Sequence, residues 1–376
     1  MMGSDWRPKY DPRAVHRELE IIKNNLHCNA VRICGLDLKR LVDASEYALE
    51  EGLEVWFSPE MWDRTQEETL AYIQSAAVEA EKLRERWPGR LVFSLGSELT
   101  LFMKGIVEGD NFFKKMNNPA FWENIKAGKH NAPLNDFLSR ANSAVRRVFH
   151  GEVTYFSVPL ETVDWSLLDY VGVDFYRDAR ISNNYGDLVK GYLSFKKPVL
   201  IGEFGCCTYL GAEKLGGTGF MIIFGMMKDY LPDIKLPPVI SQMIAAVPQV
   251  DGHYVRDEDL QARELSDQLA VLDRTGVDGA FVFTFVAPTS LYSDDPRFDT
   301  DMPSYSLVKS YAEPDTVDQI NEQGAKTARE LTGIGMDPAM LPKFASHVGK
   351  HGETYPDMPW EPKRSFRAVA DYYSSH

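Results

Sequence analysis

Two stretches of this sequence decide its fold, Arg90-Leu91-Val92-Phe93-Ser94-Leu95-Gly96-Ser97-Glu98 and Pro198-Val199-Leu200-Ile201-Gly202-Glu203-Phe204-Gly205. Each is a short apolar run that carries a glutamate where the run gives way to a loop. Runs of this kind, bounded by turn-forming residues, are typical of buried strands. Because the ends of parallel strands meet on one face of a barrel, we expect Glu98 and Glu203 to face each other across a pocket. The alternative is that both are ordinary exposed acids that follow strands.

The rest of the chain alternates between short apolar runs and amphipathic helical stretches. Further strands are predicted at 29–34, 53–58, 152–158, 170–176 and 279–285. Helices are predicted at 11–26, 38–51, 65–86, 134–149, 187–195, 256–275 and 364–373. Strands that alternate with helices over the whole length predict a parallel sheet.

The predicted fold class is α/β, a TIM (β/α)8-type barrel that forms a single domain over residues 1–376. One strand is missing from the expected eight, because 6–10 is not a convincing strand and the first predicted helix begins at Asp11. The first strand is therefore missing or degenerate, and either the barrel stays open or another segment completes it. A chain of 376 residues fits one such barrel with insertions.

Helical insertions are predicted after strands 7 and 8 of the barrel, counted with the missing strand as the first. Residues 216–250 are apolar and rich in Met, as expected of a lid over the pocket. An extra helix packed on the barrel, or a surface that makes a homodimer, explains them equally well. The second insertion, 313–352, is expected to be structural, and 100–132 is expected to be an irregular loop.

Composition excludes several classes of partner. The net charge of −14 repels phosphate backbones, so we expect no nucleic-acid partner. No apolar run reaches the length of a membrane span, and the first residues lack an apolar signal segment. We therefore expect a cytoplasmic protein that acts on a small-molecule substrate. Its four cysteines, at positions 28, 34, 206 and 207, are expected to be reduced.

No metal and no cofactor are predicted. The acidic loop 294–301 offers oxygen ligands for calcium but lacks the EF-hand pattern, so an ion-paired or solvated loop is the favoured interpretation. The histidines have no zinc spacing. Gly216-Gly217-Thr218-Gly219 is not followed by the Lys-Ser/Thr pair of a phosphate-binding loop.

The two glutamates, placed in barrel order, resemble the pattern of clan A glycoside hydrolases. That resemblance implies that Glu98 ends the fourth strand as the acid/base and that Glu203 ends the seventh as the nucleophile. It also implies that Arg32 is bonded to the nucleophile and that Tyr176 lies near it. Segments such as Leu26–Arg32 further resemble an uncharacterised bacterial and fungal group sometimes labelled abortive-infection proteins.

Two positions depart from the clan pattern. The clan has Asn before the acid/base and here the residue is Ser97, which is shorter but can still donate a hydrogen bond. The clan commonly ends its eighth strand with Trp, and here the strand ends on Phe285. Trp56, with Phe285, is a candidate for an aromatic floor that contacts substrate, although such side chains are more often core.

The residues are compatible with three functions. The first is a retaining glycosidase, in which Glu98 protonates the leaving oxygen and Glu203 attacks the anomeric carbon. The second is a non-hydrolytic lyase, isomerase or cyclase that acts on an apolar substrate, as the departures and the Met-rich insertion suggest. The third is a catalytically silent binding protein, against which the combined presence of the two glutamates with Arg32 and Tyr176 argues.

Overall fold

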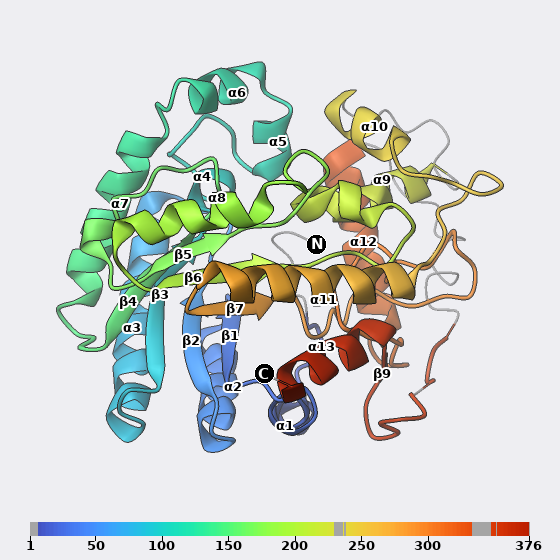
Figure 1. Cartoon of the computed structure of the whole chain (residues 1–376), viewed down its shortest axis with the longest axis horizontal. Helices are drawn as coiled ribbons and strands as arrows, with labels where there is room; N and C mark the ends of the chain where they lie inside the picture. The colour runs from blue at the N-terminus through green and yellow to red at the C-terminus, as the bar shows by residue number, and fades with distance from the viewer. Residues whose placement is uncertain (1–6, 229–235, 237, 333–346, 351, 376) are drawn as a thin grey trace.

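All seven predicted strands form a single parallel sheet in the computed structural model, which describes residues 7–228, 236, 238–332, 347–350 and 352–375 (Figure 1). The sheet order follows the chain, so that each strand pairs with the next one along the sequence. The strands are β1 (Ala30–Gly35), β2 (Glu54–Pro59), β3 (Leu91–Ser97), β4 (Glu152–Ser157), β5 (Val171–Asp174), β6 (Val199–Phe204) and β7 (Gly279–Val282). The described sheet thus begins at β1 and ends at β7.

Helices follow the strands and cover the sheet, as in a (β/α) barrel. The predicted ones are α1 (Pro12–Asn24), α2 (Leu38–Glu50), α3 (Gln66–Arg86), α7 (Asn131–Val145), α8 (Tyr185–Gly191), α11 (Glu258–Thr275) and α13 (Arg364–Ser375). The irregular loop expected at 100–132 was wrong in part, because this region contains α4 (Leu99–Phe102), α5 (Phe112–Met116) and α6 (Pro119–Lys126). Asn111 and Asn118 cap the last two of these, and neither helix is long enough to show a clear period in the sequence.

Local sequence explains where the long elements begin. Thr65 and Glu68 form a capping box at the start of α3, each side chain accepting from the backbone of the other. Every residue of β3 is buried, as expected of a central parallel strand covered on both faces. Inside the barrel, Trp56, Val92 and Phe156 pack together in a small apolar cluster.

Both predicted insertions are helical in their described parts. The first contains α9 (Ile222–Met227) and α10 (Pro238–Ala245), which lie with α5 and α6 at the upper end of the view in Figure 1. Residues 229–235 and 237 of this insertion lie outside the described residues. The second contains α12 (Val317–Thr332), and its residues 333–346 and 351 lie outside them too. A short antiparallel pair, β8 (Val308–Ser310) and β9 (Trp360–Pro362), joins the C-terminal region to the barrel.

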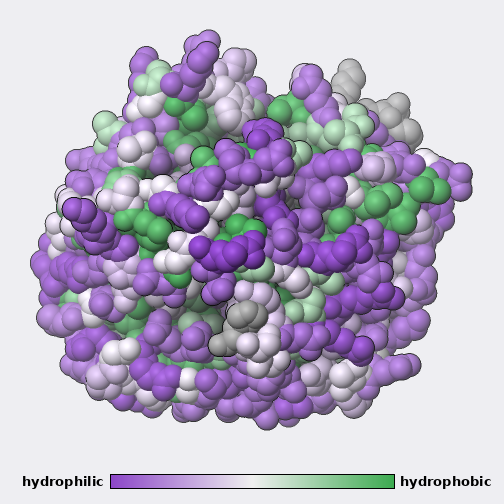
Figure 2. All heavy atoms as spheres, viewed as in Figure 1, coloured by the Kyte–Doolittle hydropathy of each residue, from purple (hydrophilic) through white to green (hydrophobic). Residues whose placement is uncertain are grey.

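The described surface is mainly polar. Figure 2 shows polar side chains over most of one face, with apolar ones in separate patches between them. Within the described ranges no helix has both the length and the apolar character needed to span a bilayer.

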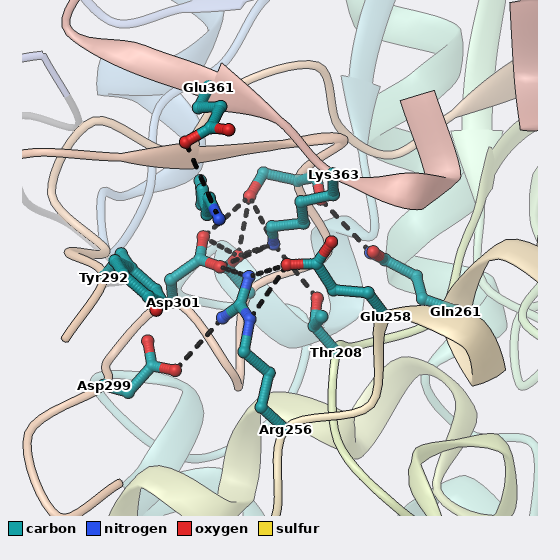
Figure 3. A network of polar contacts seen from close by, with 12 residues as sticks. Thr208, Arg256, Glu258, Gln261, Tyr292, Asp299, Asp301, Glu361 and Lys363 are labelled. Atoms are coloured by element: carbon teal, nitrogen blue, oxygen red, sulfur yellow. Dashed lines mark hydrogen bonds and ion pairs between the residues drawn. The ribbon is translucent and has the colours of Figure 1, made fainter. Parts of the chain in front are cut away.

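A buried ion-pair network anchors the C-terminal region to the loops after β6 and β7 (Figure 3). Lys363 Nζ lies 2.8 Å from Asp301, and both side chains are fully buried. Arg256 contacts the same carboxylate at 2.9 Å and Asp299 at 3.1 Å. The ion-paired interpretation of the acidic loop is therefore confirmed for its second half. Thr208 also accepts a hydrogen bond from Lys363, so one ammonium group joins three segments.

We predict that Lys363→Met lowers the free energy of unfolding by about 3 kcal/mol, because it leaves Asp301 buried with only part of its counter-charge. Urea denaturation measures this value. The matched control is Lys82→Met, which removes an ion pair to Glu79 on the surface of α3 and should cost at most about 0.5 kcal/mol. Equal effects of the two substitutions would contradict the assignment.

Candidate active site

Glu203 lies near the end of β6 and is held by two of the residues that the sequence placed beside it. Tyr176, two residues beyond β5, donates a hydrogen bond from its hydroxyl to Glu203 Oε2 at 2.8 Å. Arg32, on β1, donates from Nη1 to Glu203 Oε1 at 3.2 Å. Each oxygen of the Glu203 carboxylate thus accepts a hydrogen bond, one from a phenol and the other from a guanidinium.

Arg32 is the centre of a larger cluster that sequence reasoning missed. Its side chain is only 4% exposed, and it also contacts Asp174 at 3.0 Å and Glu60 at 2.9 Å. Its guanidinium lies 4.0 Å from the centre of the Phe156 ring. Asp174 ends β5 and Glu60 directly follows β2, so the strand-end rule that selected Glu98 and Glu203 also finds these two acids.

Gly202 is required by this crowding. Its carbonyl accepts a hydrogen bond from Arg32 at 3.2 Å, and a Cβ at this position would overlap Phe156 and the Asp174 carboxylate. The residue before Glu203 therefore has no side chain, and the arginine can reach across the barrel to the carboxylates.

Glu98 follows β3 in a left-handed backbone conformation, with φ of 48°. Such a conformation is uncommon for a residue with a side chain and occurs often at functional sites. Hydrogen bonds hold it on both sides. Its N–H donates to Phe156 O at 2.9 Å, and its carbonyl accepts from Leu101 at 2.8 Å and Phe102 at 3.1 Å.

A buried polar pair supports the turn after Glu98. The Tyr155 hydroxyl accepts a hydrogen bond from the Leu99 N–H at 2.8 Å and donates to Glu161 at 2.9 Å. Glu161 also accepts from the Thr100 N–H at 3.0 Å. Burial raises the pKa of Glu161 to about 7. These contacts fix the direction in which Glu98 leaves the strand.

The electrostatic surroundings shift the pKa values of Glu98 and Glu203 to different extents. Burial raises the pKa of Glu98 well above its usual range, and the carboxylates of Asp174 and Glu203 raise it further. Burial and Asp174 raise the pKa of Glu203 to about 8, against the opposing effect of Arg32. Arg32 contacts Glu203 directly, whereas Glu98 has no ion pair among the described residues. A proton shared by the two glutamates therefore resides on Glu98.

The remaining predicted site residues line the same cavity as Glu203, and each of them contacts other side chains. Ser97 is buried and donates to Asp174 at 2.5 Å, so its hydroxyl is already used within the cluster. Trp56 is 3% exposed in the barrel interior, where its indole donates to Glu54. Phe285 packs against Trp360 and other C-terminal rings. Trp56 and Phe285 both line the cavity, and their contact with substrate stays a prediction.

The aromatic rings of Phe283 and Tyr305 pack beside the ring of Tyr176. The ring centres of Phe283 and Tyr305 lie 6.4 Å and 5.4 Å from that of Tyr176. The Tyr305 hydroxyl donates to Gly216 O at 2.6 Å and accepts from Gly219 N at 2.9 Å, so it fixes the start of the first insertion next to the site. Tyr305 follows no predicted strand, and no pattern in the sequence singles it out.

One cavity of about 2380 Å³ contains the cluster. Arg32, Glu98 and Glu203 line it together with aromatic side chains of the loop after β3 and of the first insertion. These rings are in sequential contact, Trp62 with Phe102, Phe102 with Phe112, Phe112 with Phe113 and Phe113 with Phe224. These aromatic contacts make one part of the cavity lining apolar. Among the described residues, the site included, no group of three His, Cys, Asp or Glu side chains is placed to hold a metal ion.

Comparison with known proteins supports the fold. The structure matches a GH113 β-1,4-mannanase with a TM-score of 0.54 at 14% sequence identity, covering 96% of this chain and 93% of that one. A second GH113 β-1,4-mannanase structure matches with a TM-score of 0.52 at 14% identity, over 97% and 94% of the two chains. No family model and no curated protein sequence matches. The fold is thus the (β/α) barrel of glycoside hydrolases, and the resemblance to the uncharacterised group stays a prediction.

The raised pKa of Glu203 makes stability depend on pH. A carboxyl whose pKa is higher in the folded state contributes stability at low pH that is lost as the pH rises through that value. We predict that the free energy of unfolding falls by a few kcal/mol between about pH 5 and 8, and that Glu203→Gln flattens this fall. Urea titrations at several pH values measure both.

Glu123→Gln, on an exposed face of α6, is the matched control and should leave the slope unchanged. If Glu203→Gln had the same slope as the unmodified chain, Glu203 would not be the buried titrating group that the geometry describes.

Proposed function

We propose that this protein is a retaining glycoside hydrolase, with Glu98 as acid/base and Glu203 as nucleophile. The observation that carries the proposal is the contact set of Glu203, whose two oxygens are held by Arg32 and Tyr176. Arg32 and Tyr176 stabilise the anionic form of Glu203, while the more deeply raised pKa of Glu98 keeps a proton there to donate. The barrel shared with the GH113 mannanases supports the reaction class at the level of fold alone.

The mechanism follows from these roles. Glu98 protonates the glycosidic oxygen as the bond to the anomeric carbon breaks, and Glu203 attacks that carbon to form a glycosyl ester. Glu98, now ionised, removes a proton from water, which attacks the ester carbon and releases Glu203. Arg32 and the Tyr176 hydroxyl stabilise Glu203 each time it carries the full negative charge.

A non-hydrolytic lyase, isomerase or cyclase is the second candidate. Two observations favour it. Rings from Trp62 to Phe224 form an apolar wall, and the Ser97 hydroxyl already donates its hydrogen bond to Asp174, so it cannot donate one to a substrate. A site for an ordinary pyranoside needs polar partners for several hydroxyls, and an apolar wall supplies none. Product analysis separates the candidates, because only the hydrolase consumes water.

Single substitutions of Glu98 and of Glu203 should change the hydrolysis kinetics in different ways. Glu98→Ala should lower kcat/KM about 10³-fold on glycosides with poor leaving groups but far less on dinitrophenyl glycosides, whose leaving oxygen needs no proton. On the dinitrophenyl glycosides kcat should still fall, because Glu98 also deprotonates the water that releases the ester. Glu203→Ala should abolish turnover of both kinds, because no other group can form the ester. Steady-state kinetics on the two substrate series measures the difference.

Glu108→Gln, an exposed acid in the loop after α4, is the control and should behave as the unmodified chain. A chain that hydrolyses glycosides equally well without Glu203 would contradict the proposal.

A further inference from the structure

The one-turn helix α4 directly follows Glu98 and carries the backbone partners of that residue. The N–H groups of Leu101 and Phe102 donate to the Glu98 carbonyl at 2.8 Å and 3.1 Å. A helix of four residues has too few internal hydrogen bonds to keep its own shape, so its end groups need partners from other elements. The backbone conformation of Glu98 therefore depends on what holds α4.

A buried lysine holds the C-terminal end of α4. Lys115, on α5, donates from Nζ to three backbone carbonyls at this end, which uses all three donors of an ammonium. The acceptors are Thr100 O at 3.1 Å, Leu101 O at 3.0 Å and Met103 O at 2.6 Å. The Phe102 carbonyl accepts from the Asp63 N–H at 2.7 Å. Every carbonyl from position 100 to position 103 thus has a donor.

The burial of Lys115 is unfavourable unless these hydrogen bonds are made. Lys115 is only 1% exposed, and burial lowers its pKa to about 8, against the opposing charges of Asp63 and Glu161. The three groups that Lys115 Nζ contacts are neutral carbonyls rather than carboxylates. Removal of a charge from water is compensated here by hydrogen bonds to the end of α4, which ties the lysine to that helix.

The loop before α5 leaves room for the lysine side chain. Gly109 has a φ of 129°, and a Cβ at this position would lie 2.6 Å from Lys115 Cγ. Asn111 caps α5 and so fixes the turn from which the lysine projects. The loop backbone thus adopts a conformation that favours glycine at the point where the lysine passes.

A carboxyl group holds the opposite end of α4. Glu161 accepts a hydrogen bond from the Thr100 N–H at 3.0 Å. The N-terminal end of a helix carries partial positive charge and the C-terminal end partial negative charge. An acid at the first end and an ammonium at the second therefore both stabilise this turn, and Lys115 completes the set of partners that Glu161 begins.

We propose that Lys115 is a positioning residue for Glu98. It holds the carbonyl end of α4, and α4 in turn keeps Glu98 in the left-handed conformation that places it in the cavity wall. The catalytic part of this proposal rests on the proposed function, in which Glu98 is the acid/base. The structural part, that Lys115 fixes the Glu98 backbone, does not.

Hydrogen exchange of Lys115→Met tests the structural part, because Met fills a similar volume but has no donors. The amides of Leu101 and Phe102, which donate to Glu98, should exchange at least about tenfold faster in this variant than in the unmodified chain. Mass spectrometry of the full chain after labelling measures this rate and needs no substrate.

Kinetics on the two glycoside series show whether the effect reaches the Glu98 carboxyl. Lys115→Met should lower kcat/KM about 10²-fold on glycosides with poor leaving groups, because a displaced acid protonates the leaving oxygen less well. On dinitrophenyl glycosides, whose leaving oxygen needs no proton, kcat/KM should fall less than about threefold. A merely structural role of the lysine would lower both values alike.

Lys114→Met is the matched control, because Lys114 is the neighbour in sequence and its ammonium pairs with Asp110 on the surface. This variant should match the unmodified chain in exchange and in kinetics. If Lys115→Met does not fold, Lys115→Gln takes its place. Its amide keeps two donors, and it should show the same selective loss at about tenfold.

Two results would overturn the proposal, unchanged exchange at Leu101 and Phe102 or an equal loss of kcat/KM on both glycoside series. If the unmodified chain hydrolyses no glycoside, exchange alone decides. Faster exchange in Lys115→Met would then support the hold of Lys115 on the Glu98 backbone and count against the glycosidase. Unchanged exchange would count against Lys115 whatever the activity.

Discussion

The contact of Arg32 with three carboxylates is the constraint on which this structure depends. A guanidinium that is 4% exposed must have its charge balanced, and Glu60, Asp174 and Glu203 provide that balance from three different strands. The arginine therefore does two things at once. It holds the ends of β2, β5 and β6 together, and it orients Glu203 and stabilises the anionic form of that carboxyl beside Tyr176. Gly202 lacks a side chain because this cluster fills the space where one would lie.

The same cluster explains why the two glutamates differ. Glu98 and Glu203 both end strands and are both buried, so burial alone raises the pKa of each. The difference is the direct contact with Arg32, which only Glu203 has. Under the proposed retaining mechanism, this asymmetry makes Glu98 the proton donor and Glu203 the nucleophile. The rings from Trp62 to Phe224 form an apolar part of the cavity lining.

The sequence predicted the framework well and the fine contacts poorly. The seven strands and the long helices follow from local patterns, since apolar period and strand ends are properties of adjacent residues. The neighbours of Glu203 were implied by the resemblance to clan A glycoside hydrolases. Asp174 and Glu60 obey the same strand-end rule and could have been found by applying it to every strand. Ser97 and Tyr305 could not, because the partner of Ser97 is 77 positions away and Tyr305 contacts an insertion of no regular pattern. For Trp56 and Phe285, contact with substrate stays a prediction, because inward and outward faces of a barrel strand look alike in composition.

Covalent trapping tests the central claim most directly. A 2-deoxy-2-fluoroglycosyl fluoride of a sugar that the chain hydrolyses slows both steps but keeps a good leaving group, so a glycosyl ester accumulates. Peptide mass spectrometry of the trapped protein then locates the ester. Our account predicts one label, on Glu203. A label on any other residue, or hydrolysis that inverts the anomeric centre, would contradict it.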